Sequence, residues 1–546
     1  PMVYPSNVQE CVEMGLFAIA MGRYSGCWTG MKCIADTIET SAGVDLTGEG
    51  RQFVTPTDFE MPPDGVHWRW PDVPMNADQR LMEHKGYAAL AFARANGIDV
   101  HTWKAQTPRY GIVASGKAYE DTMQALTELE LGRDACERLG LSIYKVRMPW
   151  PLEPEGIRHF AEGLNEVMIV EERREMIENQ IKQQLFNWRA DVRPRIVGKF
   201  DDRDQPCLPF SEPLSAITVA RALATRLLMR ESLDDGMRAH LDSRLAVLDA
   251  RARASNELAP PVLRTPYFCS GCPHNTSTRL PEGSRATAGI GCHYMALWMD
   301  RSTEGFTQMG GEGASWLSQA HFTDEAHHFA NLGDGTYFHS GMLAVRAAVA
   351  SKVNITYKIL YNDAVAMTGG QAHDGDLSPD RITRQLAAEG VAPIYLLSDK
   401  PEAYTKNLAQ GVIVKHRDEL DAVMLALREK RGCSAIVYVQ TCAAEKRRRR
   451  KRGLMEDPAK RVFINPDVCE GCGDCSLQSN CVSIEPLETR MGRKRQINQS
   501  SCNKDFSCIK GFCPSFMTVT GGALKKPAND GSNCWLQINC FTELPW

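Results

Sequence analysis

The sequence predicts a multidomain α/β protein in which parallel sheets form the main domains and a small α+β module follows them. Short apolar runs alternate with helical patterns in residues 110–205 and again in residues 265–455, and such alternation is typical of parallel sheets with helical crossovers. Seven of the 19 cysteines lie between Cys469 and Cys513, as expected of a small module held together by metal ligands. The length of 546 residues accommodates roughly three or four domains.

Composition and charge are those of an ordinary globular protein. Hydrophobic residues make up 43% of the chain, charged residues make up 24%, and the net charge is −4. A nearly neutral chain of this size indicates neither a nucleic-acid partner nor a membrane surface. The mean hydropathy is −0.32, no apolar run is long enough to cross a membrane, and no leader pattern opens the chain. We therefore expect a cytoplasmic protein.

The first half of the chain divides into four segments by pattern. Residues 1–45 predict one or two helices and no strand, so we interpret them as the end of a preceding domain. Residues 46–109 are rich in Pro, Asp and Trp, which favours an extended connector. Residues 110–205 show short strands alternating with helices, as in a small parallel α/β domain. Apolar and basic positions alternate at helical spacing in residues 206–264, which predict a helical linker.

Polar residues follow two predicted strands of residues 265–455. The first strand runs into Gly333-Asp334-Gly335, and after a helical stretch the second strand ends at Asn362. Because the carboxyl ends of parallel strands meet at one edge of a sheet, we expect these residues to lie close together. Carboxylate and amide oxygens suit Mg²⁺, and the glycines let the backbone approach a diphosphate. A Gly-Asp-Gly triplet by itself is also common in ordinary turns.

The spacing of this motif resembles the thiamine-diphosphate signature. Twenty-six residues separate Gly335 from Asn362, and the signature has a GDG triplet followed by Asn after a similar interval. By that resemblance, Asp334, Asn362 and the backbone carbonyl of Ala364 bind Mg²⁺, and the segment containing Met367 and Thr368 closes over the cofactor. The cofactor-binding residues it implies are Gly333, Asp334, Gly335, Asn362, Ala364, Met367 and Thr368.

Four cysteines of the same region could form a proximal iron-sulfur site. Cys269 and Cys272 form a C-x₂-C turn shortly before the cofactor motif, and Cys292 supplies a third thiolate. Three soft ligands rarely suffice for a four-iron cluster. Cys442, at the end of a predicted strand, is the candidate fourth ligand. Zinc is the competing occupant of such a four-thiolate site.

Residues 456–520 resemble a two-cluster bacterial ferredoxin, in which the cysteine before proline ligates the cluster of the other run. By that pairing the first 4Fe-4S cluster is held by Cys469, Cys472, Cys475 and Cys513. The second is held by Cys481, Cys502 and Cys508, with Asp505 at the expected fourth position. A plain structural aspartate is the alternative for Asp505. With the proximal site, the chain would hold two or three clusters.

Seven basic residues run from Lys446 to Arg452, directly after Cys442. They could form a solvated basic loop, a nuclear signal or nucleic-acid patch, or a positive surface that attracts an acidic ferredoxin. No aromatic stacking platform accompanies them, which disfavours nucleic acid.

These motifs together resemble the large fused indolepyruvate:ferredoxin oxidoreductases, from residue 1 to about 522. The stretches that carry the resemblance are residues 6–10, 23–28, 269–278, 289–294, 331–340, 354–371 and 502–516. It implies that residues 1–45 end a pyrimidine-binding domain and that 110–205 form a transketolase C-terminal-like domain. Residues 265–455 would then form the diphosphate-binding domain, 456–520 the ferredoxin-like module, and 521–546 a tail without a counterpart in the family.

The resemblance implies oxidative decarboxylation of an aryl 2-oxo acid such as indolepyruvate, with coenzyme A as acyl acceptor and 4Fe-4S clusters passing electrons to ferredoxin. The glutamate that activates thiamine in this family lies upstream, so no catalytic residue is assigned. We expect further oxidoreductase domains or subunits on both sides, and an oligomer. Pyruvate, 2-oxoglutarate or a branched-chain oxo acid could replace the aryl substrate, and a non-catalytic electron-transfer subunit is a further alternative. A non-redox decarboxylase is disfavoured because it needs no clusters.

Overall fold

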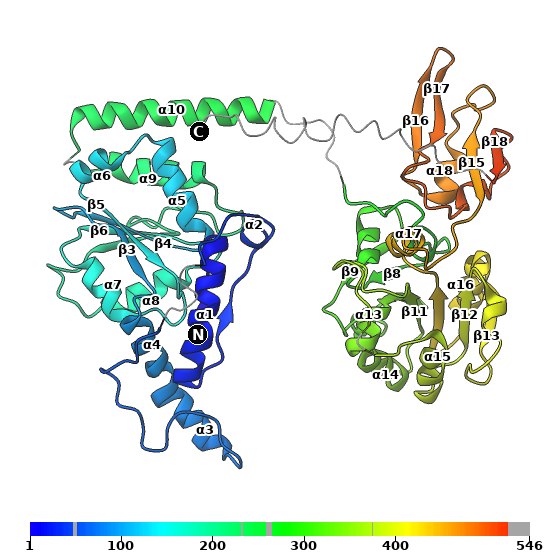
Figure 1. Cartoon of the computed structure of the whole chain (residues 1–546), viewed down its shortest axis with the longest axis horizontal. Helices are drawn as coiled ribbons and strands as arrows, with labels where there is room; N and C mark the ends of the chain where they lie inside the picture. The colour runs from blue at the N-terminus through cyan, green and yellow to red at the C-terminus, as the bar shows by residue number, and fades with distance from the viewer. Residues whose placement is uncertain (47–51, 231–232, 258–264, 374, 522–546) are drawn as a thin grey trace. The chain divides into compact units, whose positions relative to one another are not determined.

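The computed structural model describes residues 1–46, 52–230, 233–257, 265–373 and 375–521. The chain divides into two compact units, Pro1–Pro261 and Val262–Trp546 (Figure 1). Most of the predicted tail, residues 522–546, lies outside the described residues, as do parts of the predicted connector and linker. Within the described part, no helix is long and apolar enough to cross a membrane.

The first unit is built on a five-stranded sheet of order β3-β5-β4-β6-β7. Its strands are β3 (Val100–Trp103), β4 (Tyr110–Ser115), β5 (Leu141–Val146), β6 (Glu166–Val170) and β7 (Arg195–Val197). All neighbours pair in parallel except β3 and β5. The predicted connector therefore ends too late at residue 109, because β3 belongs to the sheet. A short edge strand with polar His and Thr lacks the apolar run that would have revealed it.

Helices cover both faces of this sheet (Figure 1). They are α5 (Lys117–Glu128), α6 (Arg133–Leu139), α7 (Pro154–Ala161), α8 (Met176–Leu185), α9 (Ala216–Leu228) and α10 (Asp235–Glu257). One core packs α5, α6, α9 and α10 against the sheet, and a second packs α7 and α8. The predicted helical linker is helical, but α9 is an integral layer of the domain because its apolar face joins the first core.

Residues 1–45 pack on the same unit. They contain α1 (Val8–Ser25) and α2 (Ala35–Ile38), and also β1 (Met2–Val3) and β2 (Gly30–Met31), which pair in parallel. The expectation of no strand here was wrong, because two-residue strands leave no pattern. The connector contributes α3 (Pro74–Arg80) and α4 (Gly86–Ala95), and α1 and α4 share an apolar core. Buried Glu10 on α1 pairs with Lys145 on β5 at 2.7 Å.

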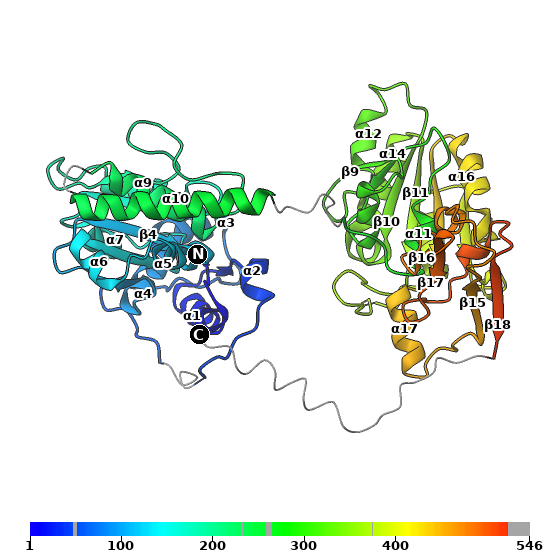
Figure 2. The ribbon, with the colours of Figure 1, turned by 90° about the horizontal axis from the view of Figure 1, so that it is seen from above.

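The second unit contains a seven-stranded, fully parallel sheet of order β13-β12-β14-β11-β10-β8-β9. Its strands are β8 (Ala286–Ala288), β9 (Thr303–Phe306), β10 (His328–Gly333), β11 (Ile355–Tyr361), β12 (Ile394–Ser398), β13 (Ile413–His416) and β14 (Cys433–Val439). Its helices are α11 (His274–Ser277), α12 (Ala314–Gln319), α13 (Asp334–Thr336), α14 (Met342–Ser351), α15 (Pro379–Ala388), α16 (Leu420–Arg428) and α17 (Ala443–Lys451). Figure 2 shows α12 and α14 on one side of the sheet and α16 on the other, in agreement with the two apolar cores.

A small antiparallel module completes the second unit. Its elements are β15 (Lys460–Ile464), α18 (Asp474–Ser479), β16 (Ile484–Thr489), β17 (Gly492–Ile497) and β18 (Phe516–Thr520). β15 pairs with β18 and β16 pairs with β17, both antiparallel. The predicted combination of parallel α/β domains and a small α+β module is thus confirmed.

Candidate functional site

The carboxyl ends of β10 and β11 bring the predicted cofactor residues together. The two strands are parallel neighbours, so Asp334 and Asn362 emerge at the same edge of the sheet. The Asp334 carboxylate accepts hydrogen bonds from the backbone N–H groups of Asn362 at 2.8 Å and Asp363 at 2.9 Å. A third bond, from Gly335 N–H at 2.9 Å, reaches its other oxygen. Bonds to backbone donors hold this carboxylate in place.

The oxygens at this edge fit a hard cation. Asn362 is 8% exposed, and its side-chain oxygen has no hydrogen-bond partner. An unpaired buried oxygen is costly, and a bound cation would satisfy it. Nε2 of His373 lies 3.5 Å from the Asp334 carboxylate, which raises the pKa of His373. Asp334 and Asn362 therefore fit Mg²⁺ by the chemistry of their donors.

The glycines and the segment after Asn362 shape the floor of the site. A Cβ on Gly333 would lie 3.0 Å from the ring of His293, and one on Gly335 would lie 3.4 Å from Val365. Ala364 is buried, whereas Met367 is 54% exposed. Thr368 donates a hydrogen bond to the side chain of Gln371 at 2.8 Å. The segment containing Ala364, Met367 and Thr368 thus begins against Gly335 and ends at the surface.

Two buried histidines beside this edge were not predicted as site residues. The rings of His274 and His293 lie 5.5 Å apart. Burial lowers the pKa of His274 to about 4 and, with the neighbouring His274, lowers the pKa of His293 well below its ordinary value. Both imidazoles are therefore neutral at pH 7. Their one sequence signal was their position, since each follows shortly after a cysteine of the proximal set.

Glu312 was also missed. Its carboxylate is 1% exposed, one oxygen accepts a hydrogen bond from Gly310 N–H at 2.7 Å, and the other has no partner. Burial raises its pKa. The residue lies against Gly289, which also contacts His293. Only burial distinguishes Glu312 from other glutamates, and its burial cannot be predicted from the local sequence.

The structure gathers the four proximal cysteines. Burial raises the pKa of Cys272 well above its ordinary value, and Cys269, Cys292 and Cys442 each raise it further by like-charge repulsion. Burial and the neighbouring Cys442 and Cys269 raise the pKa of Cys292 to about 11. Such crowding disfavours thiolates unless iron neutralises them. The backbone N–H of Cys442 donates to the carbonyl of Asn362 at 2.9 Å, so this set adjoins the cofactor edge directly.

The distal cysteines share one apolar cluster that includes members of both predicted groups. Burial and then Cys513 and Cys469 raise the pKa of Cys475. Burial, followed by Cys481 and Cys502, raises the pKa of Cys508 to about 12. Among the described residues, no three His, Cys, Asp or Glu side chains are gathered tightly enough to hold a single metal ion. A four-iron cluster is larger than one ion, so its ligand thiols are spaced more widely than those around a single metal ion.

Asp505 is engaged elsewhere than on these thiols. Its carboxylate accepts hydrogen bonds from Arg417 and Gln440, both at 2.8 Å, and from the Ser507 hydroxyl. Gln440 follows β14 and precedes Cys442 by two residues. These bonds join the loop around Asp505 to the sheet domain and occupy both carboxylate oxygens, which favours the structural alternative.

The basic run forms α17 rather than a solvated loop, because most of its charges have partners inside the unit. Arg449 pairs with Asp363 at 2.6 Å, and Arg450 donates to the Asn503 carbonyl at 2.9 Å. Lys446 lies 3.7 Å from Asp399, and Arg447 and Arg448 are bonded to the Ser500 carbonyl and to Glu445. The helix therefore connects the cofactor edge to the loop of the second distal group.

Comparisons with known proteins agree with this arrangement. The C-terminal TPP-binding domain of thiamine pyrophosphate enzymes matches residues 289–438, which include the Asp334–Asn362 edge. The middle domain of indolepyruvate ferredoxin oxidoreductase matches residues 100–258. These matches and the relatives they agree with support an indolepyruvate-type, thiamine-diphosphate-dependent oxidoreductase.

The relatives that this chain matches are longer than it is. Indolepyruvate oxidoreductase subunit IorA from Thermococcus kodakarensis is 25% identical over 431 residues, which are 74% of this chain and 60% of the relative. The subunit of the same name from Pyrococcus abyssi is 24% identical over 524 residues, which are 89% of this chain and 72% of the relative. Among solved structures, the 2-oxoglutarate:ferredoxin oxidoreductase from Magnetococcus marinus covers 34% of this chain and 66% of its own, with 19% identity and a TM-score of 0.26.

Proposed function

We propose that this chain carries the thiamine diphosphate and 4Fe-4S centres of a 2-oxoacid:ferredoxin oxidoreductase that acts on an aryl 2-oxo acid such as indolepyruvate, with coenzyme A as acyl acceptor. The observation that carries the proposal is the hydrogen bond from Cys442 N–H to the Asn362 carbonyl at 2.9 Å. This bond places Cys442, one of the four proximal thiols, next to the cofactor edge. Adjacent centres of this kind suit electron removal after decarboxylation, which a simple decarboxylase does not need.

In this proposal the cofactor edge binds Mg²⁺ and diphosphate. Asp334, the Asn362 side chain and the Ala364 carbonyl hold the ion, and the backbone at Gly333 and Gly335 approaches the phosphates. Met367 and Thr368 belong to the segment that covers the cofactor. Bound thiamine diphosphate would supply the nucleophile and the electron sink for decarboxylation. The imidazoles of His274 and His293 are neutral, so they would not repel the cation.

Three ligand sets divide the thiols in this proposal. The proximal set comprises Cys269, Cys272, Cys292 and Cys442. The first distal set comprises Cys469, Cys472, Cys475 and Cys513. The second distal set comprises Cys481, Cys502 and Cys508, and the contacts of Asp505 leave its fourth position to a ligand other than this carboxylate. Each set would take one 4Fe-4S cluster.

The remaining parts of the catalytic centre are proposed to come from domains or subunits outside these 546 residues. They include the glutamate that activates thiamine, and an oligomeric assembly would bring them to the cofactor edge. The greater length of the relatives supports this inference. Reduced ferredoxin is the expected product that leaves the assembly.

Thiamine diphosphate binding tests the proposal. Calorimetric titration of the full chain with the cofactor and Mg²⁺ should show saturable binding. Asp334→Ala should weaken this binding by more than about tenfold, because it removes a metal ligand. Asp324→Ala removes an exposed aspartate and should bind like the wild type. Wild-type protein that does not bind the cofactor would instead favour an electron-transfer subunit with a thiamine-type scaffold. Assays of the complete assembly with indolepyruvate, pyruvate and 2-oxoglutarate then rank the substrates.

A further inference from the structure

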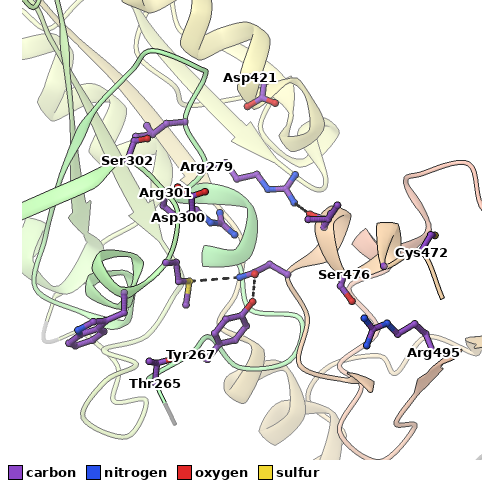
Figure 3. Close-up of a pocket in the computed structure, with 16 residues that line it drawn as sticks. Thr265, Tyr267, Arg279, Asp300, Arg301, Ser302, Asp421, Cys472, Ser476 and Arg495 are labelled. Atoms are coloured by element: carbon purple, nitrogen blue, oxygen red, sulfur yellow. Dashed lines mark hydrogen bonds between the residues drawn. The ribbon is translucent and has the colours of Figure 1, made fainter. Parts of the chain in front are cut away.

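A large pocket lies in the second unit between the sheet domain and the small module (Figure 3). Tyr267, Arg279 and Arg301 line it from the sheet domain, and Cys472 and Arg495 line it from the module. Figure 3 shows Tyr267, Arg279 and Arg301 on one side and Cys472 and Arg495 on the other. None of these residues contributes to the cofactor edge.

The arginines of this pocket have no carboxylate partners. Arg279 donates to the carbonyls of Leu477 at 2.9 Å and Gln478 at 2.5 Å. Arg301 donates to the Asn275 carbonyl at 3.0 Å and the Thr278 hydroxyl at 3.3 Å. Those bonds use neutral acceptors, so the guanidinium charges stay uncompensated.

Arg495 and the groups around it add to this excess of positive charge. Its Nε is buried without a partner, and no ion pair of the described residues includes Arg279, Arg301 or Arg495. Behind the wall, buried Lys358 donates to the Arg279 carbonyl at 3.2 Å, but burial lowers its pKa to about 7, so it carries only part of a charge at pH 7. Asp300 and Asp421 also line the pocket, and both are exposed to solvent. Burial together with Arg279 lowers the pKa of Arg301 to about 10, so Arg301 remains charged at pH 7.

The positive charge of the pocket lies beside Cys472, a predicted ligand of the first distal cluster. Cys469 and Cys475 are each 7% exposed, whereas Cys472 is exposed. A cluster held by this set would therefore approach the surface at the pocket. Exposed Trp298 and Leu477 line the same pocket. Aromatic residues and arginine are enriched in protein interfaces, so this combination suits a protein partner.

We propose that this pocket is the docking site of an acidic, one-electron acceptor protein. The inference rests on the proposed function and adds the location and chemistry of its electron exit. Carboxylates of the partner would lie over Arg279, Arg301 and Arg495, with its apolar contact on Trp298 and Leu477. A 4Fe-4S cluster held by the first distal set would supply one electron at a time to the partner's oxidised cluster. No proton or covalent bond moves in this step, and two such transfers remove the two electrons of each oxidation.

The alternative basic surface, α17, suits this role less well. Arg448, Arg449 and Arg450 pair with the carboxylates of Glu445, Asp363 and Asp457, so much of the charge on this helix is already compensated. Charge that already has a partner attracts an incoming acidic protein weakly, whereas uncompensated charge steers it.

Binding of an acidic two-cluster ferredoxin to the iron-reconstituted full chain tests this site. At low salt, Arg495→Glu should weaken the dissociation constant, measured by thermophoresis, by about tenfold or more, because like charges would then face each other. Arg495→Gln should lie between the two. Arg431→Glu is the matched control, since it makes the same charge change at an exposed residue outside the pocket. Iron content must be equal in all variants.

Equal affinities for wild type, Arg495→Glu and Arg431→Glu would overturn the docking site. So would competition in which inorganic pyrophosphate occupies the pocket without changing ferredoxin affinity, because the pocket would then belong to a small anion. Reduction of a cationic viologen dye by the wild-type assembly separates the two proposals. If the dye is reduced while Arg495→Glu has no effect on ferredoxin binding, only the docking site fails. If no dye is reduced, the proposed function fails.

Discussion

Arg417 Nη1 lies 2.8 Å from Asp505 Oδ1, across the boundary between the sheet domain and the small module. Their side chains are only 9% and 12% exposed, and Gln440 donates to the same carboxylate oxygen. A few residues away, Asp418 pairs with Lys510 across the same boundary, but those side chains are 46% and 33% exposed. One boundary thus carries a buried and an exposed ion pair.

Removing the buried partner should loosen the module. Asp505→Ala leaves Arg417 buried without its counter-charge, and breaking such a pair costs about 3 kcal/mol. We expect that loss in the free energy of local opening, read by hydrogen exchange of residues 502–508. Asp418→Ala should change it by about 1 kcal/mol or less, because exposed pairs contribute little. Iron content should stay at the wild-type level in both variants. Loss of iron in Asp505→Ala alone would restore the ligand hypothesis for this residue.

The proximal set makes a prediction about metal content. Cys442→Ser should lower iron and sulfide by one cluster's worth while the rest of the chain stays folded. Anaerobically reconstituted wild type should hold about twelve irons per chain if three 4Fe-4S clusters form, and the variant about eight. Cys33→Ser removes an exposed thiol and should leave the content unchanged. About eight irons in the wild type and in both variants would show that Cys442 holds no cluster.

The stability of the first unit should depend on pH through Glu10. Burial raises the pKa of this carboxyl, but bonds from Lys145 outweigh burial and bring the pKa below its ordinary value of 4.5. A lowered folded pKa contributes stability that is present above 4.5 and is lost as pH falls through the folded value. The unfolding temperature of the first unit in wild type should therefore fall in acid more than that of Glu10→Gln. Parallel pH profiles for both proteins would contradict this role.

Local spacing made the cofactor edge predictable. Asp334 and Asn362 each follow a buried strand, and the carboxyl ends of neighbouring parallel strands lie at the same edge of the sheet. Cys442 was predictable for the same reason, since it follows β14. The pairing of Asp505 with Arg417 spans 88 residues and could not be read from spacing, because side-chain contacts between modules leave no periodic pattern. Of the alternatives for the basic run, the solvated loop was wrong, because charge alone does not reveal which partners the fold supplies.

The hydrogen bond between Cys442 and Asn362 has a thermodynamic consequence. One backbone contact joins the thiol set to the cation edge, so whatever energy it transmits from cofactor to thiols it must also transmit from thiols to cofactor. Linkage requires equal factors in both directions. In the proposed holoprotein, iron loading would therefore change cofactor affinity by the same factor by which cofactor binding changes iron affinity.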